Sequence, residues 1–448
     1  MCGVGGSGMS ALAFLMQSRG WRVCGSDRSR DRGETPEKFA ALAERGITLY
    51  PQDGSGITGE TSLLIVSSAV EDTIPDVRSA KEKNVPIKKR AAVLAEMFNA
   101  ADLSVGVAGT SGKSTTTAMT GWILGHAGKD PTVINGAQMA NFDGRNAMTG
   151  DGPFVAEIDE SDGSIALFNP SIAVVTNISL DHKSMEELRA LFGGYLNRAK
   201  TAIVNLDDAE LIALTGAAQN CLSFSLANAK ADFYARDIVP SHNGVTFNVN
   251  GVPVRLRVPG RHNVANALAA LAAAHAAGAS LAEAAAALAE YRGIRRRFEF
   301  VGEKNGVIVI DDFAHNPDKI AATLRTLHEQ PGRIIAIFQP HGYGPTKLMR
   351  EELVRTFAAN LAADDFLLMP EIYYAGGTAT KDISSADIVN GITSTGKNAK
   401  FFSQRPLIVD YATAMARPGD RIVIMGARDD TLPVFAETIV QQMGRVKS

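Results

Sequence analysis

The chain has 448 residues, more than one hydrophobic core usually holds, so we expect about three domains. Charged residues make up 21% of the chain and the formal net charge is −3, which excludes a polybasic surface for nucleic acid or an anionic membrane. No apolar run approaches the roughly 20 residues of a membrane span, and the N-terminus lacks the basic and apolar regions of a signal peptide. We therefore expect a cytoplasmic enzyme, monomeric or homodimeric, with no nucleic-acid partner and no membrane insertion.

The first block, residues 1–99, alternates short apolar runs with helical periods, which predicts a Rossmann-like α/β domain. We expect its strands at 21–25, 63–67 and 85–88, and its helices at 35–45 and 91–98.

The chain opens with MCGVGGSGMS, in which Gly3, Gly5 and Gly8 have the spacing of a dinucleotide-binding turn. Backbone N–H groups in such a turn, at the N-terminus of a helix, bind a pyrophosphate. If the ligand were NAD, Asp27 would stand about 20 residues further on to bind the ribose hydroxyls. Only Met1 and Cys2 precede the turn, where a buried strand belongs, so we expect the natural chain to begin further upstream.

The second block, residues 100–299, begins with a strand at 104–108 that leads into Gly109-Thr-Ser-Gly-Lys-Ser114 and a helix ending near residue 127. In such a loop the backbone N–H groups surround phosphate oxygens, Lys113 contacts the β- and γ-phosphates, and the Ser114 hydroxyl is a magnesium ligand. The first glycine of the strict motif is replaced by Val107. The strand before the loop and the helix after it nevertheless favour a P-loop ATP-binding domain with a mostly parallel sheet.

Two further strands of this block end in polar side chains. The strand at 154–158 leads to Glu160, which we interpret as a magnesium ligand, although a solvated acidic loop would have the same composition. The strand at 172–176 is followed by Asp181-His182, which predicts a second metal site, unless His182 is structural. We also expect a strand at 201–205 and an alanine-rich helix at 263–277.

Three clusters lie further along the chain. His262 and Asn266, at the start of the alanine-rich helix, have groups that bind a purine edge, although capping of the helix by Asn263 explains the segment equally well. Arginines at 295–297 suit a transferring phosphoryl group, or a charged surface. The segment 311–317 directly follows a strand, which favours a binding site.

The third block, residues 300–448, again alternates strands and helices and predicts a second Rossmann-like domain. The strands are expected at 307–310, 334–338, 366–369 and 421–425. Pro317 suits the first turn of a helix whose buried face would carry Ile320, Leu324 and Leu327.

Together these motifs resemble the Mur ligase family, and the resemblance covers nearly the whole chain. The matching segments are Gly3–Ser10, Gly25–Asp27, Ser67–Ala69, Gly109–Ser114, Asp159–Asp162, Asn177 with Asp181-His182, His262–Asn266, Arg296–Phe298, Asp311–Pro317 and Gln339–His341. The glycine-rich opening with Met9-Ser10 and the Gln-Pro-His run are most similar to the branch that adds L-alanine to UDP-N-acetylmuramate.

The resemblance implies an ADP-forming ligase of peptidoglycan precursor synthesis, with ATP and Mg²⁺, that joins an amino acid, L-alanine in the first instance, to the carboxylate of UDP-N-acetylmuramate through an acyl phosphate. It implies UDP-substrate contacts from Gly5, Gly6, Ser7, Gly8, Met9, Ser10, Asp27, Ser67 and Ser68. It implies ATP contacts from Gly109, Thr110, Ser111, Gly112, Lys113, Ser114, Thr115, His262, Asn266, Arg297 and Asp311, with Asn266 on adenine and Asp311 on ribose.

The same resemblance implies catalytic roles for Lys113, Glu160, His182 and Arg297, metal ligands in Ser114, Glu160 and His182, and amino-acid contacts from His315, Asn316, His341 and Lys347.

The segment after His341 departs from this branch, because arginines usually stand where this chain has Gly342-Tyr-Gly-Pro-Thr-Lys347. The tail 426–430 also differs. Three alternatives therefore stay open: a Mur-type ligase for another amino acid or carboxylate, as in murein peptide recycling or polyglutamylation; a non-catalytic homologue; and an NAD-dependent oxidoreductase. The last one leaves the P-loop without a role.

Overall fold

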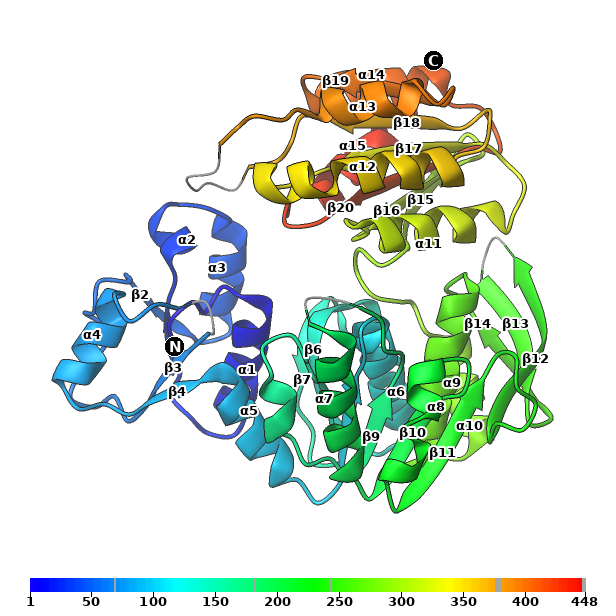
Figure 1. Ribbon diagram of the computed structural model, residues 1–448. Coiled ribbons are helices and arrows are strands. Elements are labelled where there is room, and N and C mark those ends of the chain that lie inside the picture. The colour runs from blue at the N-terminus through cyan, green and yellow to red at the C-terminus, as the bar shows by residue number, and fades with distance from the viewer. Residues whose placement is uncertain (68–69, 181–182, 242–243, 375–379, 445–448) are drawn as a thin grey trace. The chain divides into compact units, whose positions relative to one another are not determined.

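A computed structural model describes residues 1–67, 70–180, 183–241, 244–374 and 380–444. The chain forms two compact units (Figure 1). Unit 1 consists of Met1–Val239, Val245–Arg257 and Arg261–Gly293, and unit 2 of Pro240–Gly244, Val258–Gly260 and Ile294–Ser448. Unit 1 contains the first predicted domain and most of the second, so the boundaries expected between residues 99 and 100 and between residues 299 and 300 stay predictions. None of the helices in the described ranges has the length and apolar character that a membrane span requires.

The first part of unit 1 is built on short parallel strands. They are β1 (Cys24–Ser26), β2 (Thr48–Tyr50), β3 (Leu64–Val66) and β4 (Ile87–Lys89). β1 pairs with β2, and β3 pairs with β4. Cys2 lies between the two pairs and forms parallel bridges to Ser26 and Val66. Its helices are α1 (Ser7–Ser18), α2 (Arg28–Asp31), α3 (Pro36–Glu44), α4 (Pro75–Glu82) and α5 (Arg90–Asn99).

The rest of unit 1 is organised around a ten-stranded sheet, counted over the described residues, in the order β14-β13-β12-β11-β10-β9-β5-β8-β6-β7. The strands are β5 (Ser104–Ala108), β6 (Thr132–Met139), β7 (Arg145–Met148), β8 (Phe154–Glu157), β9 (Ile172–Val175), β10 (Thr201–Asn205), β11 (Asn220–Ser225), β12 (Phe233–Ser241), β13 (Gly244–Val249) and β14 (Val252–Leu256). β5 is parallel to both its neighbours, β8 and β9. All five of its residues are buried, as a central parallel strand requires.

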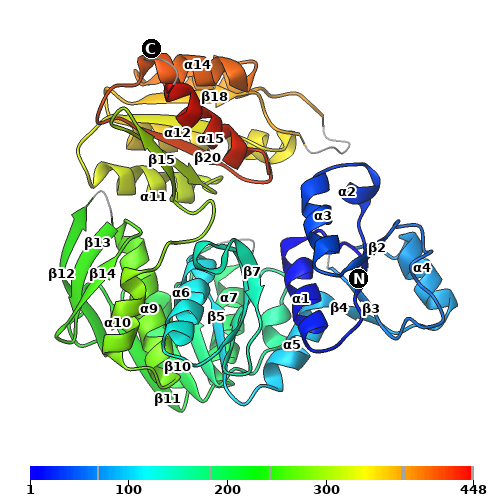
Figure 2. The same cartoon turned by 180° about the vertical axis from the view of Figure 1, so that it is seen from behind.

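Helices cover this sheet, namely α6 (Lys113–His126), α7 (Met185–Asn197), α8 (Ala209–Ile212), α9 (Arg261–Ala276) and α10 (Leu281–Ala289). Three 3₁₀ turns connect other elements, η1 (Ala140–Phe142), η2 (Ser164–Leu167) and η3 (Thr215–Ala217). Most alanines of α9 are buried, which lets this helix lie close beside α6 (Figure 2). The alanine-rich helix was therefore predicted correctly, but Asn263 lies inside its first turn and not ahead of it, so the suggested cap is wrong.

Unit 2 contains a six-stranded sheet in the order β15-β16-β20-β17-β18-β19 within the described ranges. The strands are β15 (Glu299–Lys304), β16 (Val307–Asp312), β17 (Ile334–Gln339), β18 (Phe366–Pro370), β19 (Asn398–Phe402) and β20 (Arg421–Gly426). β15 is antiparallel to β16, and the other neighbours are parallel. The carboxyl ends of β16, β20, β17 and β18 therefore lie at one edge, where ligands bind in parallel sheets.

Two helix layers enclose the sheet of unit 2. One layer contains α11 (Pro317–His328), α12 (Tyr343–Asn360) and α13 (Ser385–Thr393), and the other contains α14 (Arg405–Met415) and α15 (Leu432–Met443). Each layer shares an apolar core with one face of the sheet, and Figures 1 and 2 show the two layers from opposite sides. Pro317 begins α11, and Ile320, Leu324 and Leu327 are buried, as the sequence predicted.

Candidate functional site

The phosphate-binding loop lies between β5 and α6. Gly109 has a φ of 128° and Gly112 a φ of 87°, conformations that side-chain-bearing residues rarely adopt. A Cβ atom on Gly112 would lie 2.3 Å from Oδ1 of Asn266, so only glycine fits there. The backbone conformation of the loop therefore requires the glycines that its sequence has. Asn266, a residue of α9, lies against the loop.

The end of β9 and the residues that follow it hold the loop in place. The Thr176 hydroxyl donates to the backbone oxygen of Ser111 at 2.6 Å. The Asn177 side chain both donates to that oxygen, at 2.8 Å, and accepts the N–H of Ser111, at 3.0 Å. The Thr110 N–H donates to the Asn177 carbonyl at 3.0 Å. These bonds fix the loop before any ligand is bound, which is the preorganisation that phosphate binding needs.

Lys113 and Glu160 form a partly buried ion pair beside the loop. The Lys113 Nζ lies 2.9 Å from the Glu160 carboxylate and donates to the Gly109 carbonyl at 2.6 Å. Only 15% of the lysine side chain and 9% of the glutamate side chain are exposed. Burial raises the pKa of Glu160, and the neighbouring ammonium group of Lys113 opposes that rise. The two residues that the sequence assigned to the phosphate and the metal are thus in direct contact.

The donor set near this pair fits a magnesium ion. The Glu160 carboxylate and the Ser114 hydroxyl are hard oxygen ligands, which Mg²⁺ accepts together with waters and phosphate oxygens. Asn135 donates to the backbone oxygen of Ser114 at 3.0 Å, and its buried Oδ1 has no hydrogen-bond partner among the described residues. No group of three or more His, Cys, Asp and Glu side chains that could hold a metal occurs in the described ranges. A magnesium ion here would therefore depend on water and nucleotide for most of its ligands.

Two predicted site residues, His182 and Ser68, lie outside the described residues. Asn266 is buried, donates to Asn263 at 3.3 Å and accepts from Thr116 at 3.4 Å. His262 is exposed on the first turn of α9. The adenine role of Asn266 and the purine contact of His262 stay predictions.

The glycine-rich opening forms a turn that leads into α1. The Gly5 N–H donates to Asp27 Oδ2 at 2.8 Å, and the other carboxylate oxygen accepts the N–H of Ser29 at 2.9 Å. Gly6, the N-cap of α1, has no side chain to bind the first N–H groups of the helix. Those N–H groups and the helix dipole are therefore available to an anion.

A cation at this turn was missed by the sequence analysis. A Cβ atom on Gly8 would lie 3.2 Å from the guanidinium group of Arg90, so the arginine lies over the first turn of α1. Arg90 is the first residue of α5 and directly follows β4. A cation at the carboxyl end of a predicted strand, where ligands bind in parallel sheets, was the sequence feature that could have identified it. Asn146 of β7 also donates to the Ser7 carbonyl, at 2.6 Å, which ties the turn to the larger sheet. Ser67 lies near Gly3, because a Cβ atom there would be 3.9 Å from the Ser67 hydroxyl.

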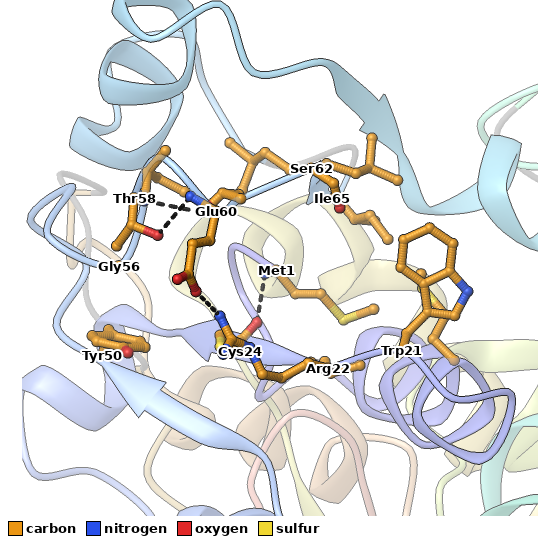
Figure 3. Close-up of a pocket in the computed structure, with 16 residues that line it drawn as sticks. Met1, Trp21, Arg22, Cys24, Tyr50, Gly56, Thr58, Glu60, Ser62 and Ile65 are labelled. Atoms are coloured by element: carbon orange, nitrogen blue, oxygen red, sulfur yellow. Dashed lines mark hydrogen bonds and ion pairs between the residues drawn. The ribbon is translucent and has the colours of Figure 1, made fainter.

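A pocket lies where β1 and β3 begin, at the opposite end of these strands from the glycine-rich turn (Figure 3). Met1 lies in it, and the terminal amino group donates to the Cys24 carbonyl at 2.7 Å. Trp21, Arg22 and Glu60 also line it. None of the predicted site residues that the structure describes lines it, so we do not assign substrate binding to this pocket.

In unit 2, Asp311 and Arg296 form a buried pair at the end of β16. The Arg296 Nε lies 3.2 Å from Asp311 Oδ2, while the buried Oδ1 has no hydrogen-bond partner in the described residues. Burial raises the pKa of Asp311 to about 7, although Arg296 opposes the rise. The guanidinium group of Arg297 lies 4.8 Å from the centre of the Phe313 ring. Asp311 is wholly buried in the described structure, so ribose contact by its side chain stays a prediction.

Two histidines come together at the carboxyl edge of the same sheet. The ring centres of His315 and His341 are 5.7 Å apart. Burial is the main cause that lowers both pKa values, that of His315 to about 4, so both rings are neutral at neutral pH. The Nδ1 of His315 lies 2.9 Å from the Phe313 carbonyl, which only accepts; Nδ1 therefore carries the proton and Nε2 is an acceptor.

The other two residues assigned to the amino acid are already engaged. The Asn316 side chain caps α11 by accepting the N–H of Lys319 at 3.0 Å. Lys347 forms an ion pair with Asp382. The structure thus brings His315 and His341 together but gives Asn316 and Lys347 local partners.

Known protein families match segments of both units. Residues 1–101, 107–274 and 296–428 match models described as the Mur ligase family catalytic domain, the Mur ligase middle domain, and the Mur ligase glutamate ligase domain. The UDP-N-acetylmuramate–L-alanine ligase of Pelotomaculum thermopropionicum is 36% identical over 95% of this chain and 94% of its own length. The same-named protein of Deinococcus radiodurans is 35% identical over 96% of this chain and 91% of its own length.

Solved structures agree with this relationship. The UDP-N-acetylmuramate-alanine ligase of Thermotoga maritima superimposes with a TM-score of 0.82 at 29% identity, over 100% of this chain and 99% of that one. A murein peptide ligase of Psychrobacter arcticus has the same fold, with a TM-score of 0.68 at 23% identity over 100% and 98% of the two chains. The chain belongs to the Mur ligase family, whose members are ATP-dependent ligases that form amide bonds.

Proposed function

We propose that this protein joins L-alanine to the carboxylate of UDP-N-acetylmuramate, with conversion of ATP to ADP and phosphate, in peptidoglycan precursor synthesis. The observation that carries the proposal is the full-length identity of 36% to a ligase of that name, together with an intact phosphate loop beside the Lys113–Glu160 pair. Since both ATP and UDP-linked sugars are cytoplasmic nucleotides, the cytoplasm is the expected place of action.

The UDP part of the substrate is assigned to the first part of unit 1. The free N–H groups at the start of α1 bind the pyrophosphate, and Arg90, over Gly8, supplies a positive charge to it. Asp27 is occupied in holding the Gly5 N–H, so its role is to shape the turn.

The chemistry begins at the phosphate loop. A carboxylate is a poor electrophile, so the γ-phosphoryl group of ATP is first transferred to it, giving an acyl phosphate and ADP. Lys113 and Arg297 stabilise the charge on the transferring group, for which single donors are worth about 3 to 4 kcal/mol. Mg²⁺, bound through Glu160 and Ser114 and in the family pattern His182, would supply further charge neutralisation of the phosphates.

The amine of the amino acid then attacks the acyl carbon, and inorganic phosphate leaves. The amine has to lose protons in this step. The Nε2 of His315 is an acceptor because Nδ1 is bound to the Phe313 carbonyl, and the neutral His341 lies beside it. We assign both rings to the binding of the amine.

Measurement of ADP release tests the proposal. The purified protein is given ATP, Mg²⁺, UDP-N-acetylmuramate and one of the common amino acids at a time, with each component omitted in turn. We expect release only from the complete mixture and the highest kcat/KM with L-alanine, and mass spectrometry of the product identifies the amide. Absence of release with every amino acid would contradict the proposal.

A further inference from the structure

Arg428 has an unusual backbone at the carboxyl edge of the unit 2 sheet. Its φ is +60°, in the left-handed region, which costs a residue with a side chain roughly 1 to 2 kcal/mol. It lies two residues after β20, in the tail that the sequence analysis found to differ from the L-alanine branch. Strained residues of this kind persist where the surrounding structure imposes them, and they concentrate at binding sites.

The position of Arg428 relative to the two histidines follows from extending the strand registers. β20 lies between β16 and β17, with Met425 paired to Asp312 and Gly426 paired to Gln339. Continuing the two registers beyond the strands brings position 428 level with His315 on one side and His341 on the other. The positive charge of Arg428 also contributes to the lowered pKa of His341, as expected for a guanidinium group close to that ring.

The proposed function assigns one other cation near this edge, Arg297, to the transferring phosphoryl group, and the following cations have local partners. Lys347 is paired with Asp382, Arg405 with Asp429, and Arg296 with Asp311. The ammonium group of Lys381 lies 5.0 Å from the centre of the Tyr374 ring and 5.8 Å from that of Tyr343.

Arg428, by contrast, is exposed and forms no ion pair or hydrogen bond within the described ranges. It is therefore a guanidinium group available to an anion at the position where the two histidines meet.

We propose that Arg428 binds the α-carboxylate of the incoming amino acid and thereby holds its amine against His315 and His341. This inference rests on the proposed ligase function. A guanidinium group binds a carboxylate through two parallel hydrogen bonds, which fixes the orientation of the amino acid as well as its affinity. Arg428 thus performs the role that the sequence analysis gave to Lys347, whose charge Asp382 already neutralises.

The variant Arg428→Gly separates binding from stability, because glycine accepts a left-handed backbone without strain. We expect the KM for the amino acid to rise about 10- to 100-fold, the range for loss of a hydrogen bond between charged groups. The KM values for ATP and the UDP substrate should stay unchanged, and the melting temperature should not fall. Arg428→Lys retains the charge but lacks the planar guanidinium group, so its KM for the amino acid should lie between those of the wild type and Arg428→Gly.

An amide analogue identifies the group that Arg428 binds. The kcat/KM of the accepted amino acid is divided by that of its α-carboxamide, which lacks the negative charge. We expect this ratio to be large in the wild-type enzyme and to fall at least tenfold in Arg428→Gly. Arg325→Ala, which removes an exposed arginine of α11, and Asn84→Gly, which relieves another left-handed residue, should leave the ratio unchanged.

Wild-type turnover tests the ligase function and the ratio tests Arg428, so the two failures are distinguishable. An unchanged KM and an unchanged ratio in Arg428→Gly would overturn the assignment while leaving the ligase function intact. If the ratio falls at least tenfold in Lys381→Ala but not in Arg428→Gly, the carboxylate binds to Lys381, and this result would also overturn the assignment to Arg428.

Discussion

At the scale of single residues, the Lys113–Glu160 ion pair brings together the residue expected to bind phosphate and the residue expected to bind the metal ion. Lys113 is held between the Gly109 carbonyl and the Glu160 carboxylate, so its charge is partly compensated before ATP binds. In the proposed function, a triphosphate that enters the loop brings new anionic partners for Lys113, which frees Glu160 for a metal ion. We therefore expect ligands to replace both partners of this partly buried ion pair, so that neither side chain is left without an opposite charge.

Removal of the lysine alone should affect both stability and turnover. In Lys113→Ala the Glu160 carboxylate is left buried without its cation, and we expect the free energy of unfolding to fall by about 2 to 4 kcal/mol. ADP formation should fall at least 100-fold. Lys113→Ala/Glu160→Gln should regain most of the stability, measured by thermal unfolding, but none of the ADP formation. Lys200→Ala, an exposed lysine in the same part of the chain, serves as the control. Normal turnover in Lys113→Ala would refute the role of the loop.

The half-buried histidine His315 should make unit 2 sensitive to acid. Its pKa is lowered to about 4 in the folded protein, mainly by burial, against about 6.5 when unfolded. The unfolded chain therefore binds more protons between these values. The stability that the neutral ring contributes is complete above pH 6.5 and is lost as the pH falls toward 4.

We expect His315 to account for about 1 to 2 kcal/mol of the stability lost between pH 7.5 and pH 5. His315→Asn keeps a donor for the Phe313 carbonyl but does not titrate, so this variant should lose less stability over the same interval. Urea unfolding at both pH values gives the comparison, with exposed His126→Asn as the control. An equal loss in wild type and His315→Asn would contradict the expectation.

At the scale of elements, the turn into α1 depends on the close approach of two other segments. A Cβ atom on Gly5 would lie 2.8 Å from Asp27 Oδ2 and 2.9 Å from the Phe39 ring. Gly5→Ala should therefore displace the turn and raise the KM for the UDP substrate at least tenfold, with a smaller effect on the KM for ATP. Gly59→Ala is a matched control, because no atom lies within 4 Å of its Cβ position. If both alanines have the same small effect, the turn does not bind the pyrophosphate.

The elements also show which features a sequence reveals. The phosphate loop and the strands beside it were predicted because their glycines and apolar runs are local signals. The hairpin of β13 and β14 was missed although its loop, Asn250-Gly251, has the positive φ values of 51° and 88° and the sequence that two-residue hairpins favour. Arg90 was missed for a different reason, since seven elements, from β1 to β4 with the helices among them, separate it from Gly8 along the chain, and only folding brings the two residues together.

At the scale of the whole molecule, the residues to which the proposed function gives roles are distributed over both units. Lys113 and Glu160 belong to unit 1, whereas Arg297, His315 and His341 belong to unit 2. The glycine turn of unit 1 was predictable from the sequence, and so was the position of Arg297 in a basic run. The sequence could not distinguish Arg297 from its neighbours, because the pairing of Arg295 with Glu299 and of Arg296 with Asp311 depends on the register of β15 and β16.

The three consecutive arginines therefore offer a test of the role proposed for Arg297. Arg297→Ala removes a cation that lies over the Phe313 ring and opposes the rise that burial causes in the pKa of Asp312. We expect ADP formation to fall about 100- to 1,000-fold. Binding of the UDP substrate to unit 1, measured by calorimetry, should be unchanged, because Arg297 does not belong to that unit. Arg295→Ala breaks only an exposed ion pair with Glu299 and should retain near-normal turnover. If Arg295→Ala and Arg297→Ala reduce ADP formation equally, the three arginines act only through their combined positive charge. Arg297 then has no specific role in phosphoryl transfer.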